Sequence, residues 1–211
     1  MKLTATTFIT LDGVMQGAGG EDEDRSNGFE LGGWVVPFAD EDFGQIITDI
    51  FRRADEILLG RTTYNDMYAY WSQVTDTEDD VAVALNTLPK HVATTRSDPL
   101  TWENSHPLKG DAIASVRELK ERPGRELQVH GSHGLVQTLL TAGVIDEFNV
   151  WVFPVVLGKG KRLFGEGTVP ATLRLTSSQV TRSGAIVATY RPKGPLVQQT
   201  VAVEDGHTVI T

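Results

Sequence analysis

The sequence predicts an α/β protein, a three-layer α/β/α sandwich built on a mixed, mostly parallel central sheet. Strand-like and helix-like segments alternate up to about residue 150, and strand-like segments follow one another after that. Alternation is typical of parallel strands joined by crossover helices, whereas consecutive strands form antiparallel pairs. Because 211 residues are enough for one well-packed domain, we expect a domain over residues 1–192 and a C-terminal tail over 193–211.

The expected strands are short apolar runs, rich in β-branched residues and bounded by turn residues. The first is Lys2–Leu11, and Asp12-Gly13 ends it. The others are predicted at 57–59, 90–95, 126–130, 147–156, 172–181 and 185–191, with a short extra strand at 99–102. Pro154 predicts an edge position or a bulge for the strand at 147–156, because proline cannot donate to a β-ladder. The tail after Pro195 has a strand-like pattern with little bulk.

The expected helices follow from apolar residues at helical spacing after a capping residue. They are predicted from Asp40 to about Arg53, from about Arg61, over 81–86, from Asp111 to the Pro123-Gly124 stop, and after Ser132. Residues 14–33 form a glycine- and acid-rich loop. That loop is long for a compact domain, which favours a functional or mobile segment.

Composition excludes several classes of protein. The formal net charge of −9 disfavours nonspecific binding to nucleic acid or to an anionic membrane. The absence of cysteine excludes disulfides, thiolate metal sites and a cysteine nucleophile. The N-terminus has no signal-peptide layout, and no apolar run approaches the ~20 residues of a membrane span. We therefore expect a cytoplasmic protein.

Three strand ends share features that suit a phosphate-rich ligand. Gly60–Thr63, Thr95–Ser97 and Gly131–Gly134 each combine a strand end with hydroxyl, arginine or glycine residues. Helix N-termini carry unpaired N–H groups and a partial positive charge, and arginine adds a forked donor. Each segment alone also fits an ordinary capped turn. Together they predict a ligand lying across one edge of the sheet, outside the carboxyl ends of the strands.

Acid–base and metal candidates are less specific. Asp12 ends a strand and Asp40 begins a helix, so each also has a purely structural interpretation as a turn or capping residue. His130 and His133 straddle a strand–helix turn and lack a third ligand, so we expect no metal site. Lys159 and Lys161 are most simply solvated, with a phosphate contact as the alternative. Neither G-x-G-x-x-G after the first strand nor a P-loop motif occurs.

The ordered motifs of the chain are similar to those of the dihydrofolate reductase-like superfamily. They are Thr10-Leu11-Asp12-Gly13, Leu59-Gly60-Arg61-Thr62-Thr63-Tyr64, Gly131-Ser132, Asp146-Glu147 and the run from Pro154 to Phe164. The branch that they resemble is the riboflavin-biosynthesis reductase domain, the RibD C-terminal type, with its stand-alone members. The resemblance covers about residues 2–191.

This resemblance implies NADPH as cofactor and a homodimer. Carried over by motif, the cofactor-binding residues would be Gly60, Arg61, Thr62, Thr63, Thr95, Arg96, Gly131, Ser132, His133, Gly134 and Leu135. Thr95 and Arg96 would meet the 2′-phosphate, and Asp12 would lie near the nicotinamide. Dihydrofolate reductases have W-x-x-P-x-[DE], whereas Trp34–Asp40 places its carboxylate one residue later.

The expected function is NADPH-dependent reduction of a small heterocyclic substrate, either pteridine-like or like 5-amino-6-(5-phosphoribosylamino)uracil. Asp12, Asp40 or an ordered water would supply the proton. Two alternatives belong to other classes. One is a non-catalytic NADPH- or nucleotide-binding regulatory homodimer of the same fold. The other is a purely structural dimer formed through the apolar strand at 148–156.

Overall fold

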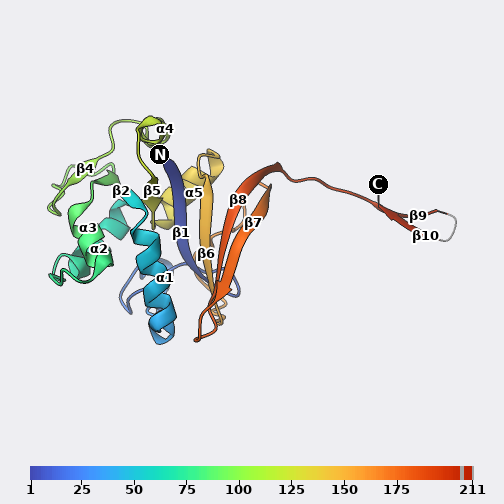
Figure 1. Ribbon diagram of the computed structural model, residues 1–211, viewed down its shortest axis with the longest axis horizontal. Helices are drawn as coiled ribbons and strands as arrows, with labels where there is room; N and C mark the ends of the chain where they lie inside the picture. Colours follow the sequence, from blue (N-terminus) through green and yellow to red (C-terminus); the bar gives the residue numbers. More distant parts are fainter. Residues whose placement is uncertain (205–206, 211) are drawn as a thin grey trace.

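The computed structural model describes residues 1–204 and 207–210. Its centre is an eight-stranded sheet with the order β4-β3-β2-β5-β1-β6-β8-β7 (Figure 1). The strands are β1 (Lys2–Thr10), β2 (Ala54–Gly60), β3 (Lys90–Ala93), β4 (Ser105–Pro107), β5 (Glu126–Val129), β6 (Glu147–Phe153), β7 (Ala171–Val180) and β8 (Ile186–Pro195). The first six in the spatial order pair in parallel, and β8 is antiparallel to both of its neighbours. The mixed, mostly parallel sheet is confirmed.

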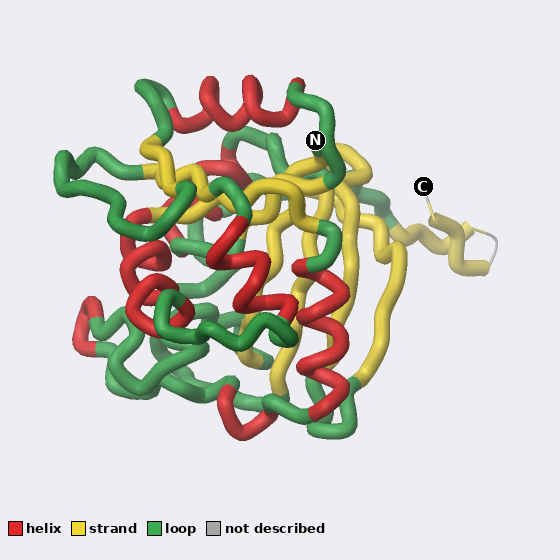
Figure 2. Tube along the Cα trace, turned by 60° about the vertical axis from the view of Figure 1, so that its left-hand side comes forward, coloured by secondary structure: helices red, strands yellow, loops and turns green. Residues whose placement is uncertain are grey.

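Helices cover both faces of the sheet and make the three predicted layers (Figures 1 and 2). The helices are α1 (Glu41–Phe51), α2 (Arg61–Trp71), α3 (Asp80–Thr87), α4 (Ala112–Glu121) and α5 (His133–Thr141). The apolar sides of α4 and α5 bury one face, with Val116 and Leu139 packed on Leu3, Leu127 and their neighbours. Helices α1, α2 and α3 bury the other face. In the part of the chain that is described, no helix is long and apolar enough to cross a membrane.

Capping aspartates set the starts of three helices. Asp40, Asp79 and Asp111 each accept hydrogen bonds from first-turn N–H groups, at α1, α3 and α4 respectively. Such caps contribute about 1 kcal/mol each because they satisfy N–H groups that have no partner within the helix. Helices α2 and α5 lack a side-chain cap, and both begin at the same edge of the sheet. Their first turns therefore keep free N–H groups.

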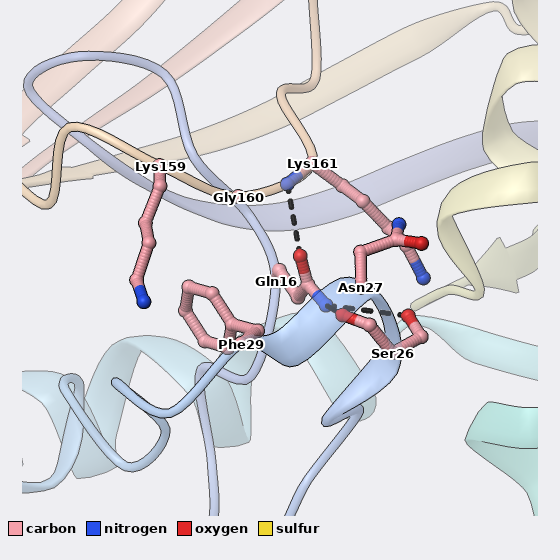
Figure 3. A pocket seen from close by; sticks show the side chains of 7 residues that line it. All are labelled: Gln16, Ser26, Asn27, Phe29, Lys159, Gly160 and Lys161. Atoms are coloured by element: carbon pink, nitrogen blue, oxygen red, sulfur yellow. Dashed lines mark hydrogen bonds between the residues drawn. The ribbon is translucent and has the colours of Figure 1, made fainter.

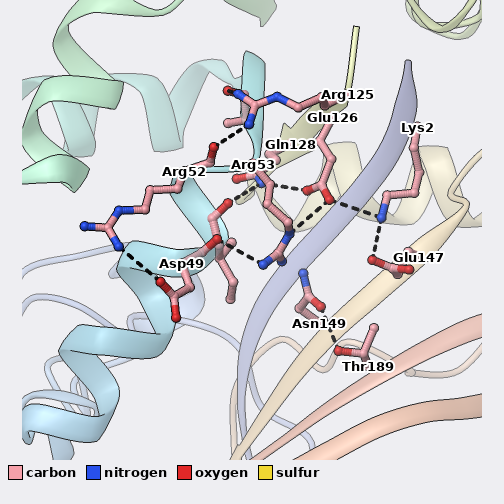
Figure 4. A network of polar contacts seen from close by, with 12 residues as sticks. Lys2, Asp49, Arg52, Arg53, Arg125, Glu126, Gln128, Glu147, Asn149 and Thr189 are labelled. Carbon is pink, nitrogen blue, oxygen red and sulfur yellow. Dashed lines mark hydrogen bonds and ion pairs between the residues drawn. The ribbon is translucent and has the colours of Figure 1, made fainter.

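A network of buried charges ties the amino-terminal ends of the strands together (Figure 4). The Lys2 ammonium lies 3.1 Å from the Glu126 carboxylate and 2.7 Å from that of Glu147. Arg53 pairs with Glu126 at 3.1 Å, and Arg191 pairs with Glu147 at 2.8 Å. Both glutamates are almost completely buried, so these partners compensate charges that would be costly to bury alone. The network joins α1, β1, β5, β6 and β8.

Two element predictions were wrong. Residues 99–102 do not form a strand; the edge strand β4 lies at Ser105–Pro107, and Trp102 packs in the core beside Tyr64. The Trp102 N–H donates to the Tyr64 hydroxyl at 2.8 Å, which holds this segment outside the β-ladder. Pro154 marks neither an edge nor a bulge, because β6 ends at Phe153 and lies between β1 and β8.

The C-terminal segment leaves the body as an extended arm (Figure 1). Strand β8 continues to Pro195, past the boundary expected at residue 192. Strands β9 (Val201–Glu204) and β10 (His207–Ile210) then pair with each other and form a sheet of their own. Val201, Val203 and Ile210 are more than half exposed on this hairpin. An isolated two-stranded hairpin is marginally stable in water, so the arm is held weakly by its own contacts.

Lys90 is a fully buried cation in the core beside α3. Its ammonium donates to the carbonyl oxygens of Leu85 at 2.8 Å and Leu88 at 2.9 Å, and lies 4.9 Å from the centre of the Trp102 ring. These groups satisfy the donors without a carboxylate. Burial therefore dominates and lowers the pKa of Lys90 to about 8.

We expect the free energy of unfolding to rise between about pH 8 and pH 10.5. In that range the unfolded chain keeps the Lys90 proton while the folded protein has released it, since the folded pKa is the lower of the two. The Lys90→Met variant should lack this rise, a difference of roughly 3 kcal/mol across the range. Urea unfolding of both proteins at several pH values measures it. Identical pH profiles would contradict a buried, proton-releasing Lys90.

Candidate functional site

The strands β1, β2, β3, β5 and β6 all end at one edge of the sheet. We call this edge the rim and define it by the segments that leave those strands, residues 11–13, 60–63, 94–97, 130–134 and 154–165. All three predicted phosphate-binding segments belong to it. The sequence-based expectation that they converge is therefore met by the topology, and their ligand roles remain predictions.

The ends of β2 and β5 approach each other unusually closely. The Gly60 N–H donates to the Gly131 carbonyl oxygen at 3.1 Å. A Cβ atom on Gly60 would lie 2.2 Å from Ser132 Oγ, and one on Gly131 would lie 2.7 Å from Thr63 Oγ1. Gly131 also has φ +141°, and the Gly131–Ser132 peptide bond is cis. A side chain at either position would collide with Ser132 or Thr63, so only glycine fits at both, and these two buried residues let the strand ends meet.

The end of β3 lies beside that junction. Gly60 pairs with Ala93 in the β2–β3 register, so Thr95 and Arg96 follow directly on the same edge. The Arg61 guanidinium donates to the Asp98 carbonyl oxygen at 3.1 Å and thereby holds the two strand ends together. Thr95 and Arg96 are exposed, and within residues 1–204 and 207–210 the Arg96 guanidinium has no ion pair. Arg96 is thus an available cation at the rim.

The remaining predicted cofactor residues fall into two groups. Thr62 and Gly134 are exposed in the first turns of α2 and α5, and His133 Nε2 lies 3.2 Å from the Arg162 carbonyl oxygen. The Leu135 side chain is buried in the core beneath α5, so any contact of this residue with a ligand would use its backbone. Thr62, His133 and Gly134 lie at the rim surface.

Asp12 is held as a carboxylate by its neighbours. The Thr10 hydroxyl donates to Oδ1 at 2.6 Å, the Leu157 N–H donates to Oδ1 at 3.2 Å, and the Gly158 N–H donates to Oδ2 at 2.8 Å. These hydrogen bonds, led by that of Thr10, lower the pKa of Asp12 to about 2. Arg162 lies 3.6 Å away. A carboxyl group with this pKa carries no proton near neutrality, which disfavours Asp12 as a proton donor.

Asp40 has both oxygens engaged in structural hydrogen bonds. Oδ1 accepts from the Phe43 N–H at 2.8 Å as the α1 cap, and Oδ2 accepts from the Ser183 N–H at 2.7 Å. The bond from Phe43 is the main reason that the pKa of Asp40 is lowered. The structural interpretation of this residue, a helix cap, is confirmed. Its geometry gives no support for proton transfer.

Two loops close over the rim beside β1 and β6 (Figure 3). The 14–33 loop and the 154–165 segment meet at a β-bridge between Val14 and Arg162, and the Met15 N–H donates to the Lys161 carbonyl oxygen at 2.8 Å. The Lys161 N–H donates to Gln16 Oε1 at 3.0 Å, and its ammonium pairs with Asp24 at 2.6 Å. A pocket of about 200 Å³ lies between the two loops.

Sequence reasoning missed Asp66, which lies on α2 one turn after Thr63 and so on the same helix face. Asp66 remains exposed to solvent, and partial desolvation, followed by the charges of Glu23 and Asp24, raises its pKa to about 6. No motif marks Asp66, because an acidic residue in a helix of an acidic protein is unremarkable in sequence. Its environment depends on the 14–33 loop folding back over α2.

The model of the RibD C-terminal domain matches residues 1–187. The chain belongs to the RibD C-terminal domain family. YyaP of Bacillus subtilis strain 168, an uncharacterized protein, is 27% identical over 188 residues, which are 88% of this chain and 92% of YyaP. The family assignment confirms the resemblance inferred from the ordered motifs.

Two solved structures show the same fold. A putative riboflavin biosynthesis protein from Shewanella sp. PV-4 has a TM-score of 0.65 at 22% identity, covering 92% of this chain and 99% of that protein. Dihydrofolate reductase from Enterococcus faecalis, solved with NADP(H), has a TM-score of 0.58 at 11% identity, covering 91% and 96%. This RibD C-terminal domain protein therefore has the dihydrofolate reductase-like fold, which is a reductase-type fold.

We expect Gly60→Ala to destabilise the protein by about 1–3 kcal/mol, because the added methyl overlaps Ser132 and forces the strand ends apart. Gly134→Ala is the matched control: nothing lies within 4 Å of its Cβ position, and it stands in the first turn of α5. That variant should be neutral or slightly more stable. Urea unfolding distinguishes the two, and equal effects would contradict the close approach at the rim.

Proposed function

We propose that this protein is an NADPH-dependent reductase of a small heterocyclic substrate, of the pteridine-like or aminopyrimidine kind expected from its sequence. The supporting observation is the rim itself, where two uncapped helix N-termini, a close glycine junction and Arg96, which has no ion pair among the described residues, lie on one edge. These are the features that bind a dinucleotide phosphate group. The family and its reductase-type fold agree with this proposal.

The residues present fit NADPH in chemical terms. The close junction of Gly60 and Gly131 brings the starts of α2 and α5 to one place, where a ligand could meet the N–H groups of both first turns. The first turns of α2 and α5 would hold the pyrophosphate, and Thr95 and Arg96 would hold the 2′-phosphate. NADPH would supply the hydride. The protein would orient the substrate, and the 14–33 loop would exclude bulk water.

The proton donor in this proposal is Asp66, an exposed residue of α2 one turn after Thr63. Its pKa of about 6 keeps a useful fraction protonated at neutral pH, whereas the carboxylates of Asp12 and Asp40 are held ionised. Asp66 lies on the same face of α2 as Thr63, whose hydroxyl contacts the rim junction at Gly131. In this proposal, Asp12 instead fixes the loop at Gly158.

The second candidate is a non-catalytic NADPH- or nucleotide-binding module. The observation that favours it is the structural use of Asp12 and Asp40, which leaves neither predicted acid available. Such a module would bind NADPH with the same rim and reduce nothing. NADPH titration by fluorescence, followed by a turnover screen with dihydrofolate and riboflavin precursors, separates the two. Cofactor binding without turnover of any substrate would favour the module.

A homodimer is also proposed. Its support is the C-terminal hairpin, whose exposed apolar residues have no cover from the body of the same chain. A second copy would bury them. Sedimentation of the full chain, compared with a chain ending at Pro195, tests this arrangement. A monomeric full-length protein would exclude both this dimer and the purely structural one.

We expect Arg96→Ala to weaken NADPH binding by ~1.5–3 kcal/mol, because a charged hydrogen bond to the 2′-phosphate is lost. NADH affinity should barely change, since NADH has no such phosphate. Arg117→Ala, an exposed position on α4, serves as the matched control. Fluorescence titration with both cofactors measures this. Equal losses for NADPH and NADH would argue against the assigned role of Arg96.

We expect Asp66→Asn to lower kcat about 100-fold or more, the contribution of a general acid. In the unchanged protein, the rate should fall as the pH rises through about 6, where Asp66 loses its proton. The variant should lack this pH dependence while binding NADPH normally. The measurement is a pH–rate profile with the substrate found in the screen. A variant with the original profile would exclude Asp66 as the proton donor.

A further inference from the structure

The pocket between the two loops has a chemistry of its own. Residues Gln16, Ser26, Asn27 and Phe29 of the 14–33 loop line it, together with Lys159–Lys161 of the 154–165 segment (Figure 3). Phe29 is almost completely buried, whereas Asn27 and Lys159 are exposed. The pocket therefore combines an aromatic wall with polar groups that are open to solvent.

Several donors of this pocket are unused. Within residues 1–204 and 207–210, neither the Lys159 ammonium nor the Asn27 side-chain amide has a hydrogen-bond or ion-pair partner. In the same part of the chain, the backbone N–H groups of Lys159 and Gly160 have no acceptor. Gly160 has φ +125°, and a Cβ there would lie 2.5 Å from Val14, so the loop needs glycine to pass this close. Asn27 lies across Phe29 and Gln16 from Lys159, so the free donors that lie together are those of Lys159 and Gly160, and they favour an anion (Figure 3).

The lysine and arginine residues of the rim fall into two groups, those with a carboxylate partner and those without one among the described residues. The rim segments carry five lysine and arginine residues. Three already have a carboxylate nearby: Arg61–Asp98 at 4.0 Å, Lys161–Asp24 at 2.6 Å and Arg162–Asp12 at 3.6 Å. Arg96 and Lys159 have none among the described residues. Arg96 follows β3 and Lys159 follows β6, so β2, β5 and β1 lie between the two strands.

We infer that the Lys159 pocket binds the anionic substituent, a phosphate monoester or a carboxylate, of the substrate. The inference rests on the proposed reductase function, in which Arg96 serves the cofactor and leaves Lys159 for the second ligand. Lys159 would provide the charge, and the N–H of Gly160 would provide a directed hydrogen bond. A strongly acidic protein, with net charge −9, needs such local cations to hold an anionic molecule.

The size of the pocket limits what enters it. A volume of about 200 Å³ holds a phosphate or carboxylate with its first few carbon atoms, and not a complete bicyclic ring with a sugar. The Gly158 N–H of the same loop binds Asp12 at the end of β1. The pocket therefore opens beside the point where β1 leaves the sheet. The heterocycle of such a substrate would lie over the rim, with its charged end between the loops.

The test is calorimetric binding of two probes, ribose 5-phosphate and pterin-6-carboxylate, with ribose and pterin as their uncharged counterparts. We expect the protein to bind at least one charged probe and to bind its uncharged counterpart at least ~10-fold more weakly. Lys159→Met should weaken the charged probe about 10-fold or more, the loss of one charge-assisted hydrogen bond. Preference between the two charged probes distinguishes a phosphate ester from a carboxylate.

Two further variants sharpen the test. Asn27→Gly removes an amide that lies across Phe29 and Gln16 from Lys159, while glycine keeps the φ of +59°, and should leave probe binding nearly unchanged. Lys193→Met is the matched control, an exposed lysine near the end of β8, at the opposite edge of the sheet. It should leave probe binding unchanged. Equal losses from Lys159→Met and Lys193→Met would overturn the proposal, as would a protein that binds neither charged probe at millimolar concentration.

NADPH titration of the same variants separates this proposal from the assignment of the cofactor. Lys159→Met should bind NADPH as tightly as the unchanged protein. If NADPH fails to bind any of the proteins while the charged probe still needs Lys159, the proposed reductase function fails and the anion pocket stands. If NADPH binding falls with Lys159→Met and probe binding does not, the pocket belongs to the cofactor and the inference is wrong.

Discussion

The close approach of β2 and β5 at their carboxyl ends is the constraint on which the candidate site depends. Gly60 and Gly131 meet without side chains, and Ser132 and Thr63 fill the space that a methyl group would need. Helices α2 and α5 start directly after these residues, so their first turns open onto the same place. A bulkier residue at either position would separate the strand ends and both helix starts with them. Local backbone packing thus sets the geometry of the candidate site.

Electrostatics adds selectivity to this framework. The protein is acidic overall, yet the rim carries five cations, and the carboxylates nearby neutralise only three of them. Asp12 and Asp24 hold the 154–165 segment in position through such contacts, so their role is structural. Among the described residues, Arg96 and Lys159 have no carboxylate partner, and they follow separate strands. This arrangement suits two anionic ligands bound side by side better than a single long one.

Much of the fold could be predicted from sequence because burial periodicity is a local property. The alternation of segments to residue 150 and the convergence of parallel strand ends both follow from it. The strand expected at 99–102 was wrong because a tertiary contact, that of Trp102 with Tyr64, decides that segment. The same reason explains Asp66, whose pKa depends on Glu23 and Asp24, residues distant in sequence. The cap made by Asp40 is local, since its main partner is the Phe43 N–H, and the sequence offered that interpretation.

The charged network at the other end of the strands has a consequence for evolution. A slip of β1 by one residue would turn Lys2 to the opposite face, and the buried Glu126 and Glu147 would each lose one of their cationic partners. The network therefore fixes the register of the strands at the edge of the sheet opposite the candidate site. The loops at the rim do not have to hold this register. Their residues can therefore be exchanged, and substrate preference can change, while the register of the strands stays the same.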